Sequence, residues 1–146
     1  MNHIDIIKSL ITPVKETKVF PKFLHWLLSD PKYGSINQTK DKKSIEAIQG
    51  VIDLYEEWLN TGLKPEQKRW LKARDIARDV NATTADAAYI AANAAVAYAA
   101  NAVANTAVDA GIPRSEVEKA QIDKLNSLIE TNGEDDLFTE NDYEKD

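Results

Sequence analysis

Few side chains in this 146-residue sequence are of the types that catalyse reactions, and their spacing does not favour catalysis. The two histidines are His3 and His25, and neither stands at metal-ligand spacing from a second ligand. His25 lies in an apolar stretch, where a structural role is favoured over metal binding. The sequence contains no cysteine, so it offers no thiolate nucleophile and no cysteine-based zinc site. Glycine-rich phosphate loops and the nucleophile-elbow and HExxH motifs are also absent from it.

Adjacent carboxylates occur at Glu56-Glu57 and at Asp135-Asp136. Neighbouring side chains diverge on a helix, and a terminal tail does not hold a fixed geometry. General acid–base catalysis by two carboxylates requires them to face each other across a cleft. We therefore expect a protein that is not an enzyme and that needs no metal or cofactor.

A cluster of basic residues is the first feature that could bind a partner. It consists of Lys64, Lys68, Arg69, Lys72, Arg74 and Arg78. Aspartates at 75 and 79 alternate with the basic residues, so a solvated helix face is the favoured interpretation. If this face does bind a partner, the candidate residues are Lys68, Lys72, Arg74 and Arg78.

The acidic C-terminal segment, residues 134–146, is the second feature. Leu137 and Phe138 form an apolar pair that follows two aspartates, a composition found in short docking peptides and similar to the terminal peptides that bind bacterial sliding clamps. The segment is otherwise nearly devoid of apolar residues, so we expect it to be disordered. A solubilising tail is the favoured interpretation, with Leu137 and Phe138 as candidate partner-binding residues.

Charge is distributed unevenly along the chain. Residues 1–80 contain 14 basic and 11 acidic residues, whereas residues 81–146 contain 4 and 13. The acidic half argues against general nucleic-acid binding, which needs a basic footprint. The N-terminal residues lack the pattern of a signal peptide, so we expect a cytoplasmic protein.

The apolar residues recur with a helical period throughout the chain, and no segment alternates with a period of two. The spacing predicts helices over residues 2–12, 20–30, 41–61, 65–80, 84–110 and 113–132, with a loop at 29–40. Gly50 lies within the third helix, where a close helix crossing would explain it. We predict an all-α fold, a bundle of five to six helices, forming a single domain over residues 1–133 with a disordered acidic tail over 134–146.

The alanine-rich stretch from Thr84 to Ala110 is predicted to form the central helix. Alanine is the best helix former, and 27 residues would make a helix of roughly 40 Å. Small side chains recur along it with the alternating three-and-four spacing of a packing seam. Its asparagines and aspartates exclude a membrane span. Whether it continues from the helix over 65–80 is left open.

The region from about Ser44 to Ala110 resembles a known family. It contains YEEWLNTG (55–62), WLKARDIARDV (70–80) and then the alanine repetition ADAAYIAANAAVAYAANAVA. These segments resemble the immunity-five-like immunity proteins of bacteria and their phages. The resemblance implies an all-α protein that neutralises a toxin by binding it, with no catalytic residues.

A protein-binding module is therefore the first functional hypothesis, as an immunity protein or an anti-defence inhibitor of bacterial or phage origin. The second is a structural protein that forms homo-oligomers through alanine seams. An enzyme is a distant third. An antifreeze-like helix is equally distant, and rests on Thr84 and Thr106, which are 22 residues apart.

Overall fold

A computed structural model describes residues 1–137 of the chain, and the all-α prediction is confirmed for this part. It contains seven α-helices rather than the five or six expected. The helices are α1 (His3–Ile11), α2 (Val19–Ser29), α3 (Lys42–Thr61), α4 (Gln67–Val80), α5 (Thr83–Ala92), α6 (Val96–Asp109) and α7 (Arg114–Asn132). Two short 3₁₀ helices, η1 (Thr12–Val14) and η2 (Ser35–Gln38), lie between α1 and α2 and between α2 and α3.

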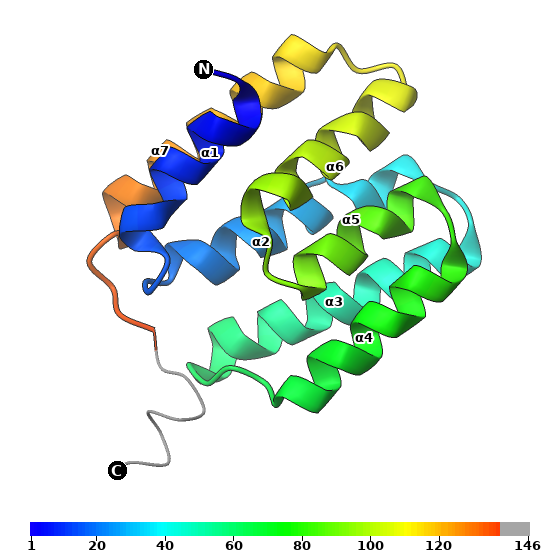
Figure 1. Cartoon of the computed structure of the whole chain (residues 1–146), viewed down its shortest axis with the longest axis horizontal. Coiled ribbons are helices and arrows are strands. Elements are labelled where there is room, and N and C mark those ends of the chain that lie inside the picture. Colours follow the sequence, from blue (N-terminus) through cyan, green and yellow to red (C-terminus); the bar gives the residue numbers. More distant parts are fainter. Residues whose placement is uncertain (138–146) are drawn as a thin grey trace.

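The helices pack in an order that partly follows the chain. Figure 1 shows α3 and α4 at one end of the bundle, α1, α6 and α7 at the other, and α2 and α5 between them. Each helix from α2 to α6 packs on the helix that follows it. In addition, α1 and α2 pack on α6 and α7. The largest fully buried apolar side chains include four from α2, namely Phe23, Leu24, Leu27 and Leu28. The helix predicted over residues 20–30 is therefore present, and its apolar side chains are buried.

The N-terminal helices are tied to the C-terminal part by buried polar groups. His3 Nε2 lies 2.6 Å from Gln121 Oε1, and Gln121 Nε2 donates to the carbonyl oxygen of Ala100 at 2.9 Å. Gln121 is completely buried, so these hydrogen bonds satisfy an amide that would otherwise be costly to bury. Lys22 of α2 donates in the same way to Asn132 Oδ1 of α7 at 2.7 Å.

The alanine-rich stretch is not one helix, and this prediction is wrong. It breaks between α5 and α6, where Ala94 adopts a left-handed conformation with φ of 61°. The N–H of Ala95 donates to Ile90 O at 3.3 Å and that of Ala94 to Ala91 O at 3.0 Å. This pair of bonds is a Schellman motif, which ends a helix by satisfying its last carbonyl groups. The break allows both halves to bury their small side chains within one molecule.

Both halves nevertheless lie at the centre of the bundle, as expected. α5 packs against α2, α3, α4 and α6, while α6 packs against α1, α2, α5 and α7. The buried alanines include residues 85, 87, 88 and 91 in α5 and residues 97, 99, 100, 104 and 107 in α6. Small side chains permit these helices to approach their neighbours closely, which accounts for the alanine content.

Left-handed residues end four of the helices. They are Gly62 after α3, Asn81 after α4, Ala94 after α5 and Gly111 after α6. Glycine and asparagine adopt positive φ at little cost, whereas alanine adopts it only with backbone strain. Asn81 also separates α4 from the alanine-rich stretch, so the two are not continuous.

The segment after Gly133 is ordered further than predicted. The N–H of Lys18 donates to Asp135 O at 2.9 Å, and that of Leu137 donates to Glu16 O at 3.0 Å. The partly buried side chain of Leu137 packs against the main core. The boundary at residue 133 is therefore wrong, because backbone pairing does not depend on an apolar composition. The remainder of the predicted disordered tail, residues 138–146 with Phe138, lies outside the described residues.

Candidate functional site

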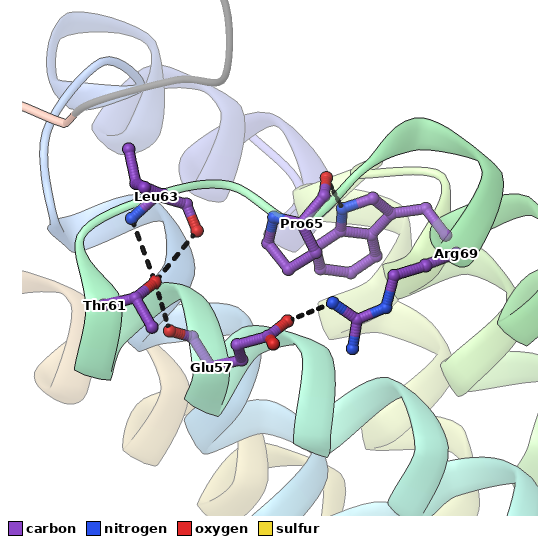
Figure 2. A network of polar contacts seen from close by, with 6 residues as sticks. Glu57, Thr61, Leu63, Pro65 and Arg69 are labelled. Carbon is purple, nitrogen blue, oxygen red and sulfur yellow. Dashed lines mark hydrogen bonds and ion pairs between the residues drawn. The ribbon is translucent and has the colours of Figure 1, made fainter. Parts of the chain in front are cut away.

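The turn between α3 and α4 holds these two helices in a fixed antiparallel arrangement. Figure 2 shows Thr61, whose hydroxyl donates to Glu57 O at 2.8 Å and accepts from the N–H of Leu63 at 3.1 Å. Arg69 of α4 forms an ion pair with Glu57 of α3 across the turn. The indole N–H of Trp70 donates to Pro65 O at 3.0 Å. The start of α4 is thereby fixed against the end of α3.

The four predicted partner-binding residues of α4 do not form one basic surface. At 100° per residue, Lys68 and Lys72 lie roughly 120° around the helix axis from Arg74 and Arg78. Arg74 pairs with Asp75 at 2.9 Å, and Arg78 lies 3.4 Å from the same carboxylate.

Nearby acidic side chains neutralise most of this charge. Arg78 also lies 3.3 Å from Asp79, and Lys68 lies 3.2 Å from Glu66. Within residues 1–137, Lys72 forms no ion pair. Exposed pairs of this kind contribute little to stability. They do place a carboxylate beside the guanidinium group of both Arg74 and Arg78.

A groove of about 250 Å³ runs between α3 and α4 on the outer side of the hairpin. Its lining includes the small residues Ala47, Gly50 and Ala73, together with Lys72 and Ile76. Ile76 is 47% exposed, which is high for a large apolar side chain. The groove thus combines small residues and the exposed Ile76 with charged side chains of both signs, Glu46, Arg69 and Lys72.

Gly50 is the unusual residue of this groove. A Cβ atom added to it would meet no atom within 4 Å, so the expectation of a close helix crossing at Gly50 is wrong. Glycine within a helix costs about 1 kcal/mol relative to alanine. No packing within residues 1–137 accounts for that cost.

A serine, a histidine and a glutamate lie together beside η2, but they do not form a catalytic triad. Ser29 Oγ lies 3.3 Å from His25 Nδ1, and His25 Nε2 lies 3.5 Å from Glu56 Oε2. A nucleophilic serine must give its proton to the histidine. Here the Ser29 hydroxyl donates to the carbonyl oxygen of His25 at 2.6 Å, one helical turn earlier. The hydroxyl therefore satisfies the helix backbone instead.

The other predicted site residues lie elsewhere. Leu137 lies beside the segment before α2, far along the chain from the α4 residues, and its partly buried side chain packs against the core. Within residues 1–137, no three His, Asp or Glu side chains lie close enough together to hold a metal ion. None of the helices in that part combines the length and apolar character that crossing a membrane would require.

Sequence reasoning missed the groove, although its signal was present. The link over residues 62–66 has the length found in antiparallel helix pairs, and residues 46–54 of α3 lie across the groove from residues 69–76 of α4. Gly50 was recognised as unusual, but the open space beside it depends on how α3 and α4 are rotated relative to each other. Comparison of the chain with protein-family models, with curated proteins and with solved structures finds no match.

Proposed function

We propose that this chain is a non-enzymatic protein-binding module whose partner docks in the groove between α3 and α4. The observation that carries the proposal is Gly50, a helical glycine with open space where its side chain would be. Glycine occurs where another backbone or ligand approaches closely. Because no part of residues 1–137 approaches Gly50, a partner that does so would explain its presence.

The groove suggests the chemistry of the partner surface. Ile76 offers an exposed apolar contact, and Lys72 offers an ammonium group that forms no ion pair within residues 1–137, beside a second charged lining residue, Glu46. A partner helix that places a small or apolar side chain over Gly50 and a carboxylate near Lys72 would match both features. Charge complementarity of this kind raises the rate of association more than the final affinity.

We further propose that the partner is a toxin or defence factor, and that the chain inhibits it as an immunity or anti-defence protein of bacterial or phage origin. The resemblance to immunity proteins supports this proposal, because WLKARDIARDV forms most of α4 and supplies Lys72, Ala73 and Ile76 to the groove. YEEWLNTG spans the end of α3 and lies outside the groove lining.

The alternatives receive less support. Assembly through alanine seams would need those seams on the surface, but most of the alanines of α5 and α6 are buried within the chain. The antifreeze alternative is contradicted, because Thr84 and Thr106 lie on different helices. Thr106 is also only 2% exposed.

To test this proposal, a substitution fills the groove, and the amount of partner that co-purifies with the protein is measured. Gly50→Leu places a bulky side chain in the open space and should leave the protein folded, because nothing lies within 4 Å of the added Cβ. Ser127→Leu is the matched control, on the exposed side of α7. Tagged proteins would be purified from host cells, and the bound proteins identified by mass spectrometry.

We expect a partner that the parent and Ser127→Leu retain and that Gly50→Leu loses. The quadruple change of Lys68, Lys72, Arg74 and Arg78 to glutamine should slow association with that partner and reduce its salt dependence. The groove is not the docking site if the folded Gly50→Leu protein recovers the same partner in the same amount.

A further inference from the structure

A separate cavity lies on the other side of the α3–α4 hairpin, where α3, α4 and the α5–α6 break meet. Its volume is about 140 Å³, and its lining includes Phe20, Tyr55, Trp58, Trp70, Asn93 and Ala94. Apolar cavities of about 150 Å³ hold a molecule of the size of benzene. The cavity is therefore large enough for one small aromatic molecule.

Four aromatic rings form a continuous cluster in the walls of this cavity. The ring centroids of Tyr55 and Trp70 lie 4.6 Å apart at 61°, and Trp58 lies 6.2 Å from Tyr55 and 6.1 Å from Phe20. Tyr55 is fully buried, and its hydroxyl donates to Ala91 O at 2.6 Å, which fixes the ring. Rigid rings in these offset and tilted arrangements suit a flat aromatic ligand.

Two donors around the cavity, from Lys64 and Trp58, have no hydrogen-bond acceptor within residues 1–137. Lys64 Nζ lies 5.6 Å from the centroid of Trp58, and it pairs with no carboxylate of residues 1–137. The buried indole N–H of Trp58 has no acceptor in that part of the chain. A ligand at this site would be held by its acceptor atoms, and a negative charge would be attracted to Lys64.

A cationic ligand does not suit the cavity, even though its walls are aromatic. The ammonium of Lys64 already occupies a cation–π position over Trp58 and would repel a second cation. The aromatic walls and the ammonium therefore favour an aromatic anion over an aromatic ammonium compound.

The backbone at the cavity wall is strained. Ala94 lines the cavity at φ of 61°, and Asn81 is the only other residue of 1–137 besides glycine with positive φ. Strain of this kind concentrates at binding and active sites, where the surrounding structure holds it in place. It positions Asn93 beside the cavity, and the side chain of Asn93 makes no hydrogen bond within residues 1–137.

We propose that this cavity binds a small aromatic carboxylate, with the ring against the aromatic walls and the carboxylate at the ammonium of Lys64. Such a ligand fits the volume of the cavity, its ring can pack against the aromatic walls, and its carboxylate is complementary to the charge of Lys64. The site is separate from the groove at Gly50, which lies across the hairpin.

Benzoate is the probe, with benzyl alcohol, benzylamine and acetate as comparators. Each would be titrated into the full chain while the three indole N–H signals are followed by nuclear magnetic resonance, assigned with tryptophan-to-phenylalanine variants. We expect benzoate to shift the Trp58 and Trp70 signals saturably and to leave the Trp26 signal unchanged, because Trp26 does not line the cavity. Benzyl alcohol should bind about tenfold more weakly than benzoate, and benzylamine and acetate should not bind.

Lys64→Gln should weaken benzoate binding about tenfold and remove the preference over benzyl alcohol. Lys8→Gln is the matched control, since Lys8 Nζ lies 4.7 Å from the centroid of the exposed Tyr98 ring, away from the cavity. It should leave benzoate binding unchanged. The proposal is overturned if benzoate causes no saturable shift, if acetate or benzylamine binds as well as benzoate, or if Lys64→Gln binds benzoate as the parent does. These results are independent of partner recovery through the groove at Gly50.

Discussion

Replacing Ala94 by glycine is expected to stabilise the protein. A left-handed conformation costs a residue other than glycine about 1–2 kcal/mol. Glycine relieves this strain, but it also gains conformational freedom in the unfolded chain, worth about 0.5–1 kcal/mol. Ala94 is exposed, so loss of its methyl group removes little packing. The net effect should be a gain of about 0.5–1 kcal/mol in the free energy of unfolding, or about 1–4 °C in melting temperature.

The sign of this effect separates two structures of the alanine-rich stretch. In a continuous helix over residues 84–110, a glycine at position 94 would cost about 1 kcal/mol. In the broken helix described above, the same change is stabilising. Urea unfolding followed by circular dichroism at 222 nm and by tryptophan fluorescence would measure the difference, provided that the two probes give coincident transitions.

Gly111 supplies the matched control. It ends α6 with the same pair of hydrogen bonds, at φ of 100°, and a Cβ added to it would meet no atom within 4 Å. Gly111→Ala should therefore destabilise through backbone conformation alone, opposite in sign to Ala94→Gly. If Ala94→Gly also destabilises by about 1 kcal/mol, residue 94 is helical in solution and the break between α5 and α6 is refuted.

Three further predictions concern the core and the C-terminal segment. Ala99→Leu should destabilise by about 1–3 kcal/mol in thermal unfolding, because Ala99 is fully buried and the added atoms overpack the interior; a melting temperature equal to that of the parent would contradict this. Burial raises the pKa of the Tyr55 phenol well above its usual value of about 10, so the unfolded chain loses a proton that the folded protein retains. Stability should then fall above pH 10 by about 1.4 kcal/mol per pH unit through this group, and Tyr55→Phe should remove that part of the slope in urea titrations from pH 9 to 11. A chain ended after Gly133 should unfold at a lower temperature than one ended after Leu137, because only the longer chain pairs with residues 16–18; equal melting temperatures would show that this pairing adds nothing.

The helices that the sequence predicted correctly carry strong apolar patterns. In α3, residues such as Ile48, Tyr55 and Trp58 recur on one face, and all are buried. Asp41 caps this helix, since its carboxylate accepts the N–H of Ser44 at 2.9 Å. Hydrogen bonds from Ser44 lower the pKa of the Asp41 carboxyl group, and the bond from the Ser44 hydroxyl has a larger effect than the bond from its backbone N–H. Local signals of this kind are sufficient because each one acts within a few residues.

The break in the alanine-rich stretch was not predictable in this way. Helix ends are usually marked by glycine or asparagine, as at Gly111 and Asn81, and Ala94 carries no such mark. Alanines on both sides favour a helix equally, so only the packing of α5 and α6 against their neighbours determines where the helix ends. The strain at Ala94 is a tertiary effect that overrides a local preference.

The candidate sites depend on which faces of helices distant in the sequence lie against each other, and composition does not encode this. The sequence indicated the alternating charges along α4, but the angle around the helix axis between Lys72 and Arg78 places the basic residues on two sides of the helix. The aromatic cavity joins Phe20 to Trp70 and Asn93, from three separate parts of the chain. The pairing of Leu137 with Glu16 likewise uses backbone groups that every residue possesses.

The attachment of α1 and α2 to the last helices has a consequence for how the chain folds during synthesis. The helices from α3 to α6 contact their immediate successors, so each can pack as soon as the next leaves the ribosome. The N-terminal helices emerge first, yet partners such as Gln121 and Asn132 are made more than a hundred residues later. We expect α1 to stay without its main packing partners until α6 and α7 have been made. Chaperones would then recognise this helix on the nascent chain, and its docking would be the slow step of refolding.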